Sequence, residues 1–286
     1  MKSTKKIISI DKLHAFENHP YKVQDNEEME ALAESITEHG ILSPVIVRPL
    51  ENSKDEYEII SGHRRVMASR KAGITEVPAL IVSLDRDAAA IVLVDSNLHR
   101  EHILPSEKAF AYKMKAEAMK HQGWRSDLTS PQVVAKSRTT EMVGADTGDS
   151  HEQVRRYIRL TNLIPEILQY VDDGCISFTP AVELSYLNEQ EQQDLLEQIE
   201  QSDCTPSLSQ ACRFKKISQG EGLTPEVIAE IMEEEKANQK EMFKVPMADI
   251  RKFIPKGNEQ QTKEFVLAAC EHYRKFLIRQ RNRDER

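Results

Sequence analysis

The sequence predicts an α+β protein, with a mixed α/β domain over residues 1–103, an all-α domain over 104–218 and a helical C-terminal segment over 219–286. Two observations support this prediction. Short apolar runs typical of strands alternate with helical patterns in the N-terminal third of the chain, which indicates a sheet covered by helices. After Pro105 only helical patterns follow, and the polar stretch KKISQGEG at 215–222 has the composition of a linker.

The N-terminal elements follow from apolar spacing and from turn residues. In EEMEALAESITEH, apolar side chains recur at helical spacing, and Gly40 is well placed to cap the helix. Short runs rich in Val and Ile, bounded by polar or glycine-containing stretches, are typical of strands. We expect strands at 7–10, 44–49, 57–61 and 77–84, and helices at 27–39, 62–71 and 86–99.

The composition limits the classes of function. The formal net charge is −8, which excludes a uniformly basic nucleic-acid coat but leaves room for local basic surfaces. The longest apolar runs, PVIVRPL and AAAIVLV, are too short to span a membrane, and the N-terminus lacks the apolar stretch of a signal peptide. The cysteines show no C-x-x-C spacing, so we expect reduced thiols in a cytoplasmic protein without membrane contact.

Residues 139–160, TTEMVGADTGDSHEQVRRYIRL, have the pattern of a helix-turn-helix. Met142 and Val143 would face inward from the first helix, and Gly144 would begin the tight turn. A surface helix with solvated arginines is the alternative interpretation. The acidic character of the flanking sequence makes the cluster of arginines stand out and favours DNA binding.

The second helix of this motif would begin at a cap supplied by Asp149 or Ser150, because either side chain can accept first-turn amides. Val154 and Ile158 would face the core. Early polar residues suit base edges, and arginines suit phosphates or guanine. The candidate DNA-binding residues are therefore Ser150, His151, Gln153, Arg155, Arg156 and Arg159, with base contacts expected from His151 and Gln153 and phosphate contacts from the three arginines.

Residues 58–68, EIISGHRRVMA, place a glycine and two arginines where a strand ends and a helix begins. Gly62 allows a tight turn, and the free amides of the helix start attract anions. The planar guanidinium groups of Arg64 and Arg65 suit phosphate oxygens. The stretch therefore predicts a polyphosphate cradle, with surface ion pairs as the alternative.

A second stretch, SNLHRE at 96–101, ends a buried helix. Asn97 and Arg100 lie three residues apart and therefore share a face of that helix. An amide and a guanidinium there could complete a nucleotide pocket, and Asn97 would be available to a bound metal ion.

The order of these motifs resembles the ParB family of partition proteins. That family carries a G-E-R-R box after a strand, an E-N-x-x-R box about thirty residues on, and then a helix-turn-helix. The corresponding stretches here are GHRR at 62–65 and SNLHR at 96–100. The resemblance covers roughly residues 7–190 and includes EHGILSPVIVRP at 38–49, ILPSEKAFAY at 103–112 and PEILQYVDDGCISFTPAVELSYL at 165–187.

The resemblance implies a DNA-binding partition protein that recognises a centromere-like site on double-stranded DNA and serves plasmid or chromosome segregation. In the family, CTP and Mg²⁺ occupy a pocket formed by the two boxes, CTP closes a homodimer into a clamp that slides on DNA, and a ParA-like ATPase moves the complex. The protein would then be associated with a nucleoid or plasmid. Carried over to this chain, the nucleotide-binding residues are Gly62, His63, Arg64, Arg65, Asn97 and Arg100, with Asn97 as a possible Mg²⁺ ligand.

This chain departs from the family at both box glutamates, which are replaced by His63 and Ser96. Carboxylates are the usual groups that hold Mg²⁺ or orient an attacking water. We therefore expect nucleotide binding with slow hydrolysis of CTP or none.

The C-terminal segment gives a weaker signal. The acidic helix over 226–236 is expected to solvate the chain or to space its domains. The last helix carries apolar residues followed by Arg279, Arg281, Arg283 and Arg286, which is typical of a dimerisation helix with a basic end or of a frayed terminus. This short tail resembles ParB proteins of plasmids and integrative elements.

Two other functions compete with partition. A helix-turn-helix transcriptional regulator would use the N-terminal domain only to pair subunits, without nucleotide gating. An enzyme on the same scaffold, such as a sulfiredoxin-like reductase or a nuclease, is disfavoured. The stretch SGHRR has no cysteine beside its arginines, and no cluster of metal-binding acids accompanies the two boxes.

Overall fold

The computed structural model describes residues 3–123, 140–234 and 259–284 except positions 24, 52, 54, 99, 101, 146 and 221, together with residues 251 and 253. The chain divides into two compact units, Met1–Glu234 and Glu235–Arg286. The predicted loop at 123–138 lies almost entirely outside the described residues.

The N-terminal part of the first unit is built on a mixed five-stranded sheet of order β1-β5-β3-β4-β2. β1 is antiparallel to β5 and β4 to β3, whereas β3 runs parallel to β5 and β2 to β4. The predicted strands are confirmed, although β1 begins earlier than expected and the short β2 was not predicted. The strands are β1 (Ser3–Ser9), β2 (Leu13–His14), β3 (Val45–Pro49), β4 (Tyr57–Ser61) and β5 (Glu76–Val82).

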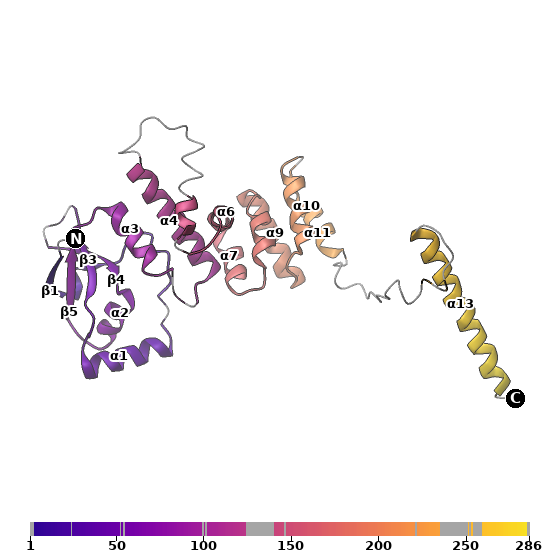
Figure 1. The fold of residues 1–286 in the computed structure, drawn as a ribbon, viewed down its shortest axis with the longest axis horizontal. Coiled ribbons are helices and arrows are strands. Elements are labelled where there is room, and N and C mark those ends of the chain that lie inside the picture. Colours follow the sequence, from indigo (N-terminus) through magenta and orange to yellow (C-terminus); the bar gives the residue numbers. More distant parts are fainter. Residues whose placement is uncertain are drawn as a thin grey trace. The chain divides into compact units, whose positions relative to one another are not determined.

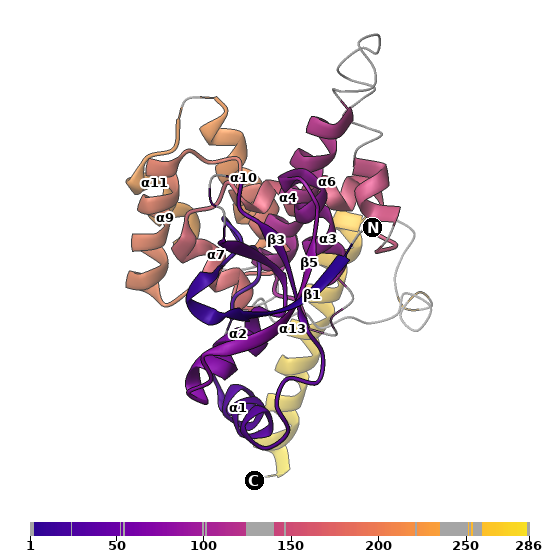
Figure 2. The same cartoon turned by 90° about the vertical axis from the view of Figure 1, so that its left-hand side faces the viewer.

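Helices cover both faces of this sheet (Figures 1 and 2). Side chains alternate between the faces of a strand, so Ile59 and Ile60 of β4 belong to different cores. Ile59 packs with Val66 of α2 (His63–Lys71), and Ile60 packs with Leu93 of α3 (Arg86–Asp95). Because both faces are covered there, the inner strands β3, β4 and β5 are rich in apolar residues, whereas the edge strand β1 is mostly exposed.

Helix α1 (Glu27–His39) matches its predicted range. Asn26 caps it by accepting a hydrogen bond from the Met29 amide, and Gly40 ends it with a positive φ of 69°. Its buried Met29 packs against Ala68 of α2, so α1 and α2 form a small core of their own.

Helix α4 (Pro105–Gly123) continues the N-terminal core into the helical region. Tyr112 of α4 lies in one cluster with Leu93 of α3 and Val154 of α6 (His151–Leu160). Lys115, almost fully buried in α4, forms an ion pair with Asp95 of α3 at 2.6 Å. The predicted boundary at 103/104 therefore falls between helices that share a core.

The remaining helices of this unit pack around a second core. Two expectations for this region were wrong. Helix α10 runs through to Ser218, so most of 215–222 is helical or turn, and α11 buries Ile228 and Ile231 against the core instead of spacing domains. The acidic residues of α11 occupy only one of its faces, so its acidic composition alone did not indicate that the other face is buried. The helices are α7 (Pro165–Asp172), α8 (Phe178–Leu184), α9 (Glu189–Ser202), α10 (Leu208–Ser218) and α11 (Pro225–Glu233).

The second unit contains the predicted last helix, α13 (Glu259–Asp284). Its apolar side chains Phe265, Leu267, Tyr273 and Phe276 are exposed within the described chain. The side chains of the predicted basic end lie outside the described residues. In the part of the chain that the structure describes, no helix is long and apolar enough to cross a membrane.

Candidate functional site

The turn between β4 and α2 requires a glycine for two reasons. Gly62 has a φ of 106°, a conformation that L side chains rarely adopt. A Cβ at this position would also lie only 2.8 Å from Cγ1 of Val45 in the neighbouring strand. The turn thus brings the start of α2 close to the sheet and leaves its first amides facing outward.

A cavity of about 180 Å³ opens at this turn. Three segments line it: the loop after β2, the β4–α2 turn and the end of α3 with the residues that follow. The structure therefore brings all six predicted nucleotide-binding residues together. The lining residues are His19, Tyr21, Lys22, Val23, Ser61, Gly62, His63, Arg64, Arg65, Ser96, Asn97 and Arg100.

His63 carries an unsatisfied polar atom in this cavity. Its Nε2 is buried and has no hydrogen-bond partner among the described residues. The ring packs against that of His19, with centroids 4.0 Å apart and planes tilted by 57°. Burial, together with the nearby His19 and Arg100, lowers the pKa of His63 to about 3, so the ring is neutral near pH 7. A buried group without a partner marks a place where a ligand can supply one.

The arginines of the pocket differ in their contacts. Arg64 forms an exposed ion pair with Glu28 at 3.0 Å. Arg65 donates from Nη1 to the backbone carbonyls of Ser43 and Pro44, and burial lowers the pKa of its guanidinium. Arg65 has no carboxylate partner in the described chain, so it carries a half-buried positive charge that an anion would stabilise.

The helix predicted over 86–99 ends at Asp95, so the expectation that Asn97 and Arg100 share a helical face was wrong; both follow the helix and still line the pocket. Arg100 lies over the ring of Tyr21 at 5.4 Å, a cation–π contact. Asn97 is buried and donates from Nδ2 to the Leu93 carbonyl at 2.7 Å. No cluster of three or more His, Cys, Asp or Glu side chains suited to a metal ion occurs among the described residues. Asn97, the predicted Mg²⁺ ligand, lines the pocket, but no carboxylate accompanies it in the described lining, so the residues present fit a phosphate chain well and a magnesium ion poorly.

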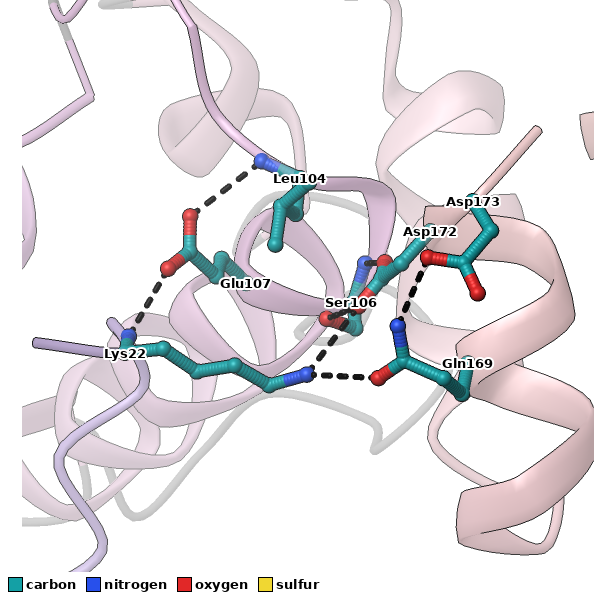
Figure 3. A network of polar contacts seen from close by, with 7 residues as sticks. All are labelled: Lys22, Leu104, Ser106, Glu107, Gln169, Asp172 and Asp173. Carbon is teal, nitrogen blue, oxygen red and sulfur yellow. Dashed lines mark hydrogen bonds and ion pairs between the residues drawn. The ribbon is translucent and has the colours of Figure 1, made fainter. Parts of the chain in front are cut away.

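Lys22 connects the pocket to the helical region (Figure 3). Its backbone amide donates to Glu107 of α4 at 2.7 Å, and its Nζ reaches Gln169 and Asp172 of α7 at 3.2 and 3.3 Å. Asp172 also accepts from the amide and the hydroxyl of Ser106 at 2.9 and 2.6 Å, which holds the start of α4. One network thus holds the pocket loop, α4 and α7 together.

The predicted helix-turn-helix is present, with residues 140–145 helical and α6 as the second helix. Ser150, the second of the two proposed caps, accepts from the Gln153 amide at 3.2 Å. A Cβ on Gly144 would collide with the carbonyl of Asp149, so the turn depends on this glycine. One expectation was wrong: Val143 is fully buried, but Met142 is 57% exposed, because this short helix buries only one side.

The turn before α6 is fixed by Asp149. Its Oδ2 accepts hydrogen bonds from the Tyr112 hydroxyl at 2.5 Å and forms an ion pair with Lys108 at 2.7 Å. Burial alone would raise the pKa of Asp149, but the bonds from Lys108 and Tyr112 outweigh it and leave the pKa below its ordinary value. The start of α6 is thus rigidly attached to α4.

The polar residues of α6 divide by their contacts. His151 and Arg155 are exposed, and Gln153 is partly exposed. Arg156 lies over Phe178 at 4.9 Å and donates to Thr179 at 3.1 Å. Arg159 lies over Tyr186 at 3.4 Å and donates to the Ser185 carbonyl at 3.3 Å, although its buried Nε has no partner in the part of the chain that the structure describes. The face open to a ligand is therefore centred on His151, Gln153 and Arg155.

The loop after β2, which supplies His19, Tyr21 and Lys22 to the pocket, was not predicted from the sequence. The stretch HPYK has only the composition of a turn, and its part in the pocket depends on the pairing of β2 with β4. No local signal in the sequence identifies it.

Comparison with known proteins supports two domain assignments. Residues 1–98 match the family model of the ParB N-terminal domain, and residues 132–207 match that of the ParB HTH domain. Together the two ranges cover more than half of the chain.

Individual proteins are also similar. The probable chromosome 1-partitioning protein ParB of Deinococcus radiodurans is 35% identical over 61% of this chain and 53% of its own length. The nucleoid occlusion protein of Listeria innocua is 32% identical over 68% of this chain and 62% of its own length. A crystal structure of C-terminally truncated ParB from Caulobacter crescentus complexed with CTP-gamma-S is 26% identical, covers 68% of this chain and 98% of that chain, and has a TM-score of 0.32. The chain thus spans just over half to three fifths of the length of these two curated relatives.

Proposed function

Because the chain belongs to the ParB family, we propose that it is a DNA-binding partition protein that recognises a centromere-like site through α6 and is gated by CTP in the N-terminal pocket. Its biological role is then the segregation of a plasmid or a chromosome. A homodimer and a ParA-like ATPase are the partners that this role requires.

The observation that carries the proposal is the pocket at Gly62. It combines a helix start, three arginines (Arg64, Arg65 and Arg100) and a buried His63 Nε2 that has no partner among the described residues. Amides and guanidinium groups bind phosphate oxygens, so a triphosphate would satisfy groups that the described chain leaves unpaired. The same compact unit carries the helix-turn-helix, attached to the pocket loop through α4 and Lys22.

The proposal does not require hydrolysis. His63 and Ser96 stand where the family has glutamates, and no carboxylate lines the pocket in the described residues. We propose that CTP acts as a binding signal and is turned over slowly or not at all. Robust CTP turnover by the purified protein would contradict this part.

The pocket is tested by calorimetric binding of CTP, with ATP and GTP as competitors for specificity. We expect selective CTP binding that weakens at least about tenfold in Arg64→Ala, since a phosphate contact is lost. Arg86→Ala is the matched control, because Arg86 is a similarly exposed arginine paired with a glutamate, Glu17, outside this pocket. Equal loss in both variants would remove the assignment of Arg64.

The DNA function is tested by selecting bound sequences from a random duplex pool and then comparing closed circles with linear fragments that carry the selected site. A nucleotide-gated clamp should persist on closed circles when CTP is present and run off linear ends. Binding to a single operator with no effect of CTP on retention would favour the transcriptional regulator instead.

Dimerisation is proposed to use α13, whose apolar side chains are exposed in the described chain. The double variant Tyr273→Glu, Phe276→Glu places charge on this face and should shift the sedimentation mass from dimer to monomer. Arg274→Glu serves as a control that adds negative charge without removing an apolar group. An unchanged mass in the double variant would remove α13 from the interface.

A further inference from the structure

The charge of the pocket lining has one sign. The described lining contains the basic side chains Lys22, Arg64, Arg65 and Arg100 and no aspartate or glutamate. Two of these cations have a carboxylate partner at the rim, Glu28 for Arg64 and Asp172 for Lys22. Arg65 and Arg100 have none in the described chain. The pocket therefore has an excess of positive charge.

Magnesium needs oxygen ligands in octahedral geometry and is usually held by one or two carboxylates together with substrate phosphates. The pocket offers the imidazole of His63 and the hydroxyl of Ser96 at the two family glutamate positions. Imidazole suits zinc, copper or nickel far better than magnesium. Mg²⁺ would also enter a site that already repels cations.

The two glutamates of the adjoining cavity are engaged in other contacts. Glu28 and Glu107 line the adjoining cavity, not the pocket. Glu28 pairs with Arg64, and both oxygens of Glu107 accept backbone amides, from Lys22 and Leu104. Moving Glu107 to a metal would leave those two amides unpaired.

The basic side chains of the pocket can take over the two roles that a metal ion has in other triphosphate sites. A divalent ion bound to a triphosphate neutralises charge and fixes oxygen positions. Here the guanidinium groups of Arg65 and Arg100 provide fixed positive charge, and the neutral His63 ring can donate one hydrogen bond through its buried Nε2.

We propose that this pocket binds the triphosphate of its nucleotide as the free polyanion, without a divalent cation, and that arginine and lysine charges replace the metal. The inference rests on the proposed nucleotide gate and specifies the ionic form of its ligand. It predicts a ParB-type pocket in which chelation of Mg²⁺ leaves nucleotide binding intact.

The test is calorimetric titration of the full chain with CTP in EDTA and in excess Mg²⁺. We expect the wild type to bind CTP at least as tightly in EDTA as in excess Mg²⁺, because Mg²⁺ in solution complexes the free triphosphate and competes with the pocket for it. The double variant His63→Glu, Ser96→Glu places carboxylates at the two family positions, and its affinity should become at least about tenfold higher with Mg²⁺ than in EDTA.

A second readout is independent of that variant's folding. In this experiment, paramagnetic Mn²⁺ is added to the wild-type complex with CTP, and the linewidths of the ³¹P resonances of bound nucleotide are measured. The matched sample also contains excess inorganic phosphate, which competes for the ion. We expect the linewidths of the bound nucleotide to be the same in the two samples. CTP binding only in Mg²⁺, or specific broadening of the bound β- and γ-phosphates, would overturn the metal-free mode while leaving the nucleotide gate in place. Absence of CTP binding under both conditions would overturn the gate and this inference together.

Discussion

The polar groups that line the N-terminal pocket and those that hold the turn before α6 differ in how far their hydrogen bonds are satisfied. In the pocket, His63 Nε2 is buried without a partner and Arg65 has no carboxylate partner among the described residues. Around the helix-turn-helix, Asp149 is held by Lys108 and Tyr112, and Arg156 is held by α8. Unpaired groups are costly in a folded protein, so the pocket is a site prepared for a ligand. The bonds that hold Asp149 instead keep α6 rigid. The exception on α6 is the buried Nε of Arg159, which has no partner among the described residues.

Each region depends on one glycine, and the largest expected effect is at the helix-turn-helix. In Gly144→Ala the new Cβ would collide with the backbone carbonyl of Asp149, which cannot move without breaking the turn. We expect a loss of roughly 3 kcal/mol in unfolding free energy, measured by urea denaturation. Gly148→Ala is the control, because its Cβ meets nothing within 4 Å and only its positive φ costs about 1 kcal/mol. Equal losses would mean that crowding at Gly144 is relieved by movement.

The second glycine tests the pocket. Gly62→Ala combines a positive φ with a contact 2.8 Å from Val45, whose side chain can shift, so we expect about 2 kcal/mol of destabilisation and loss of CTP binding. Gly73→Ala, at a positive φ of 71° with open space around it, should destabilise less and leave CTP binding unchanged. Retained CTP affinity in Gly62→Ala would show that the close approach of backbone to ligand is not needed.

The two regions also differ in how far the sequence predicts them. Both boxes and the helix-turn-helix are local patterns, so Gly62, Ser150 and the range of α1 could be read directly. His19 and Lys22 could not, because they join the pocket only through strand pairing and through contacts with α4 and α7. The exposure of Met142 and the intramolecular contacts of Arg159 were also beyond sequence reasoning, since each depends on which neighbour fills the space beside it.

The unpaired histidine predicts a pH effect. The pKa of His63 is about 3 in the folded protein and about 6.5 in the unfolded chain. Between these two values His63 is protonated in the unfolded state and neutral in the folded state, so acidification favours unfolding. Stability should therefore fall with pH from about 6.5 towards 3. We expect about 1 kcal/mol between pH 6.5 and 5, discounted for partial exposure of the ring.

This pH dependence is measured by urea denaturation of wild type, His63→Gln and His151→Gln at pH 7 and pH 5. The loss on acidification should shrink in His63→Gln only, because His151 is exposed at the start of α6. An identical pH dependence in all three proteins would exclude His63 as its source.

The smallest effect on stability is expected for a substitution of Arg155. This variant distinguishes the residues of α6 that contact DNA from those that pack against the rest of the protein. Arg155 is exposed, with no hydrogen bond or ion pair to the other described residues, so Arg155→Ala should leave unfolding unchanged. It should weaken binding to all DNA sequences alike and reduce the slope of log affinity against log salt by about one, since one phosphate contact is lost.

Arg159→Ala should instead cost about 1 kcal/mol of stability, because it leaves the Ser185 carbonyl and the Tyr186 ring without their partner. If Arg155→Ala weakens binding to one sequence only, Arg155 contacts a base, and the rigid helix presents a guanidinium to the groove rather than to the backbone.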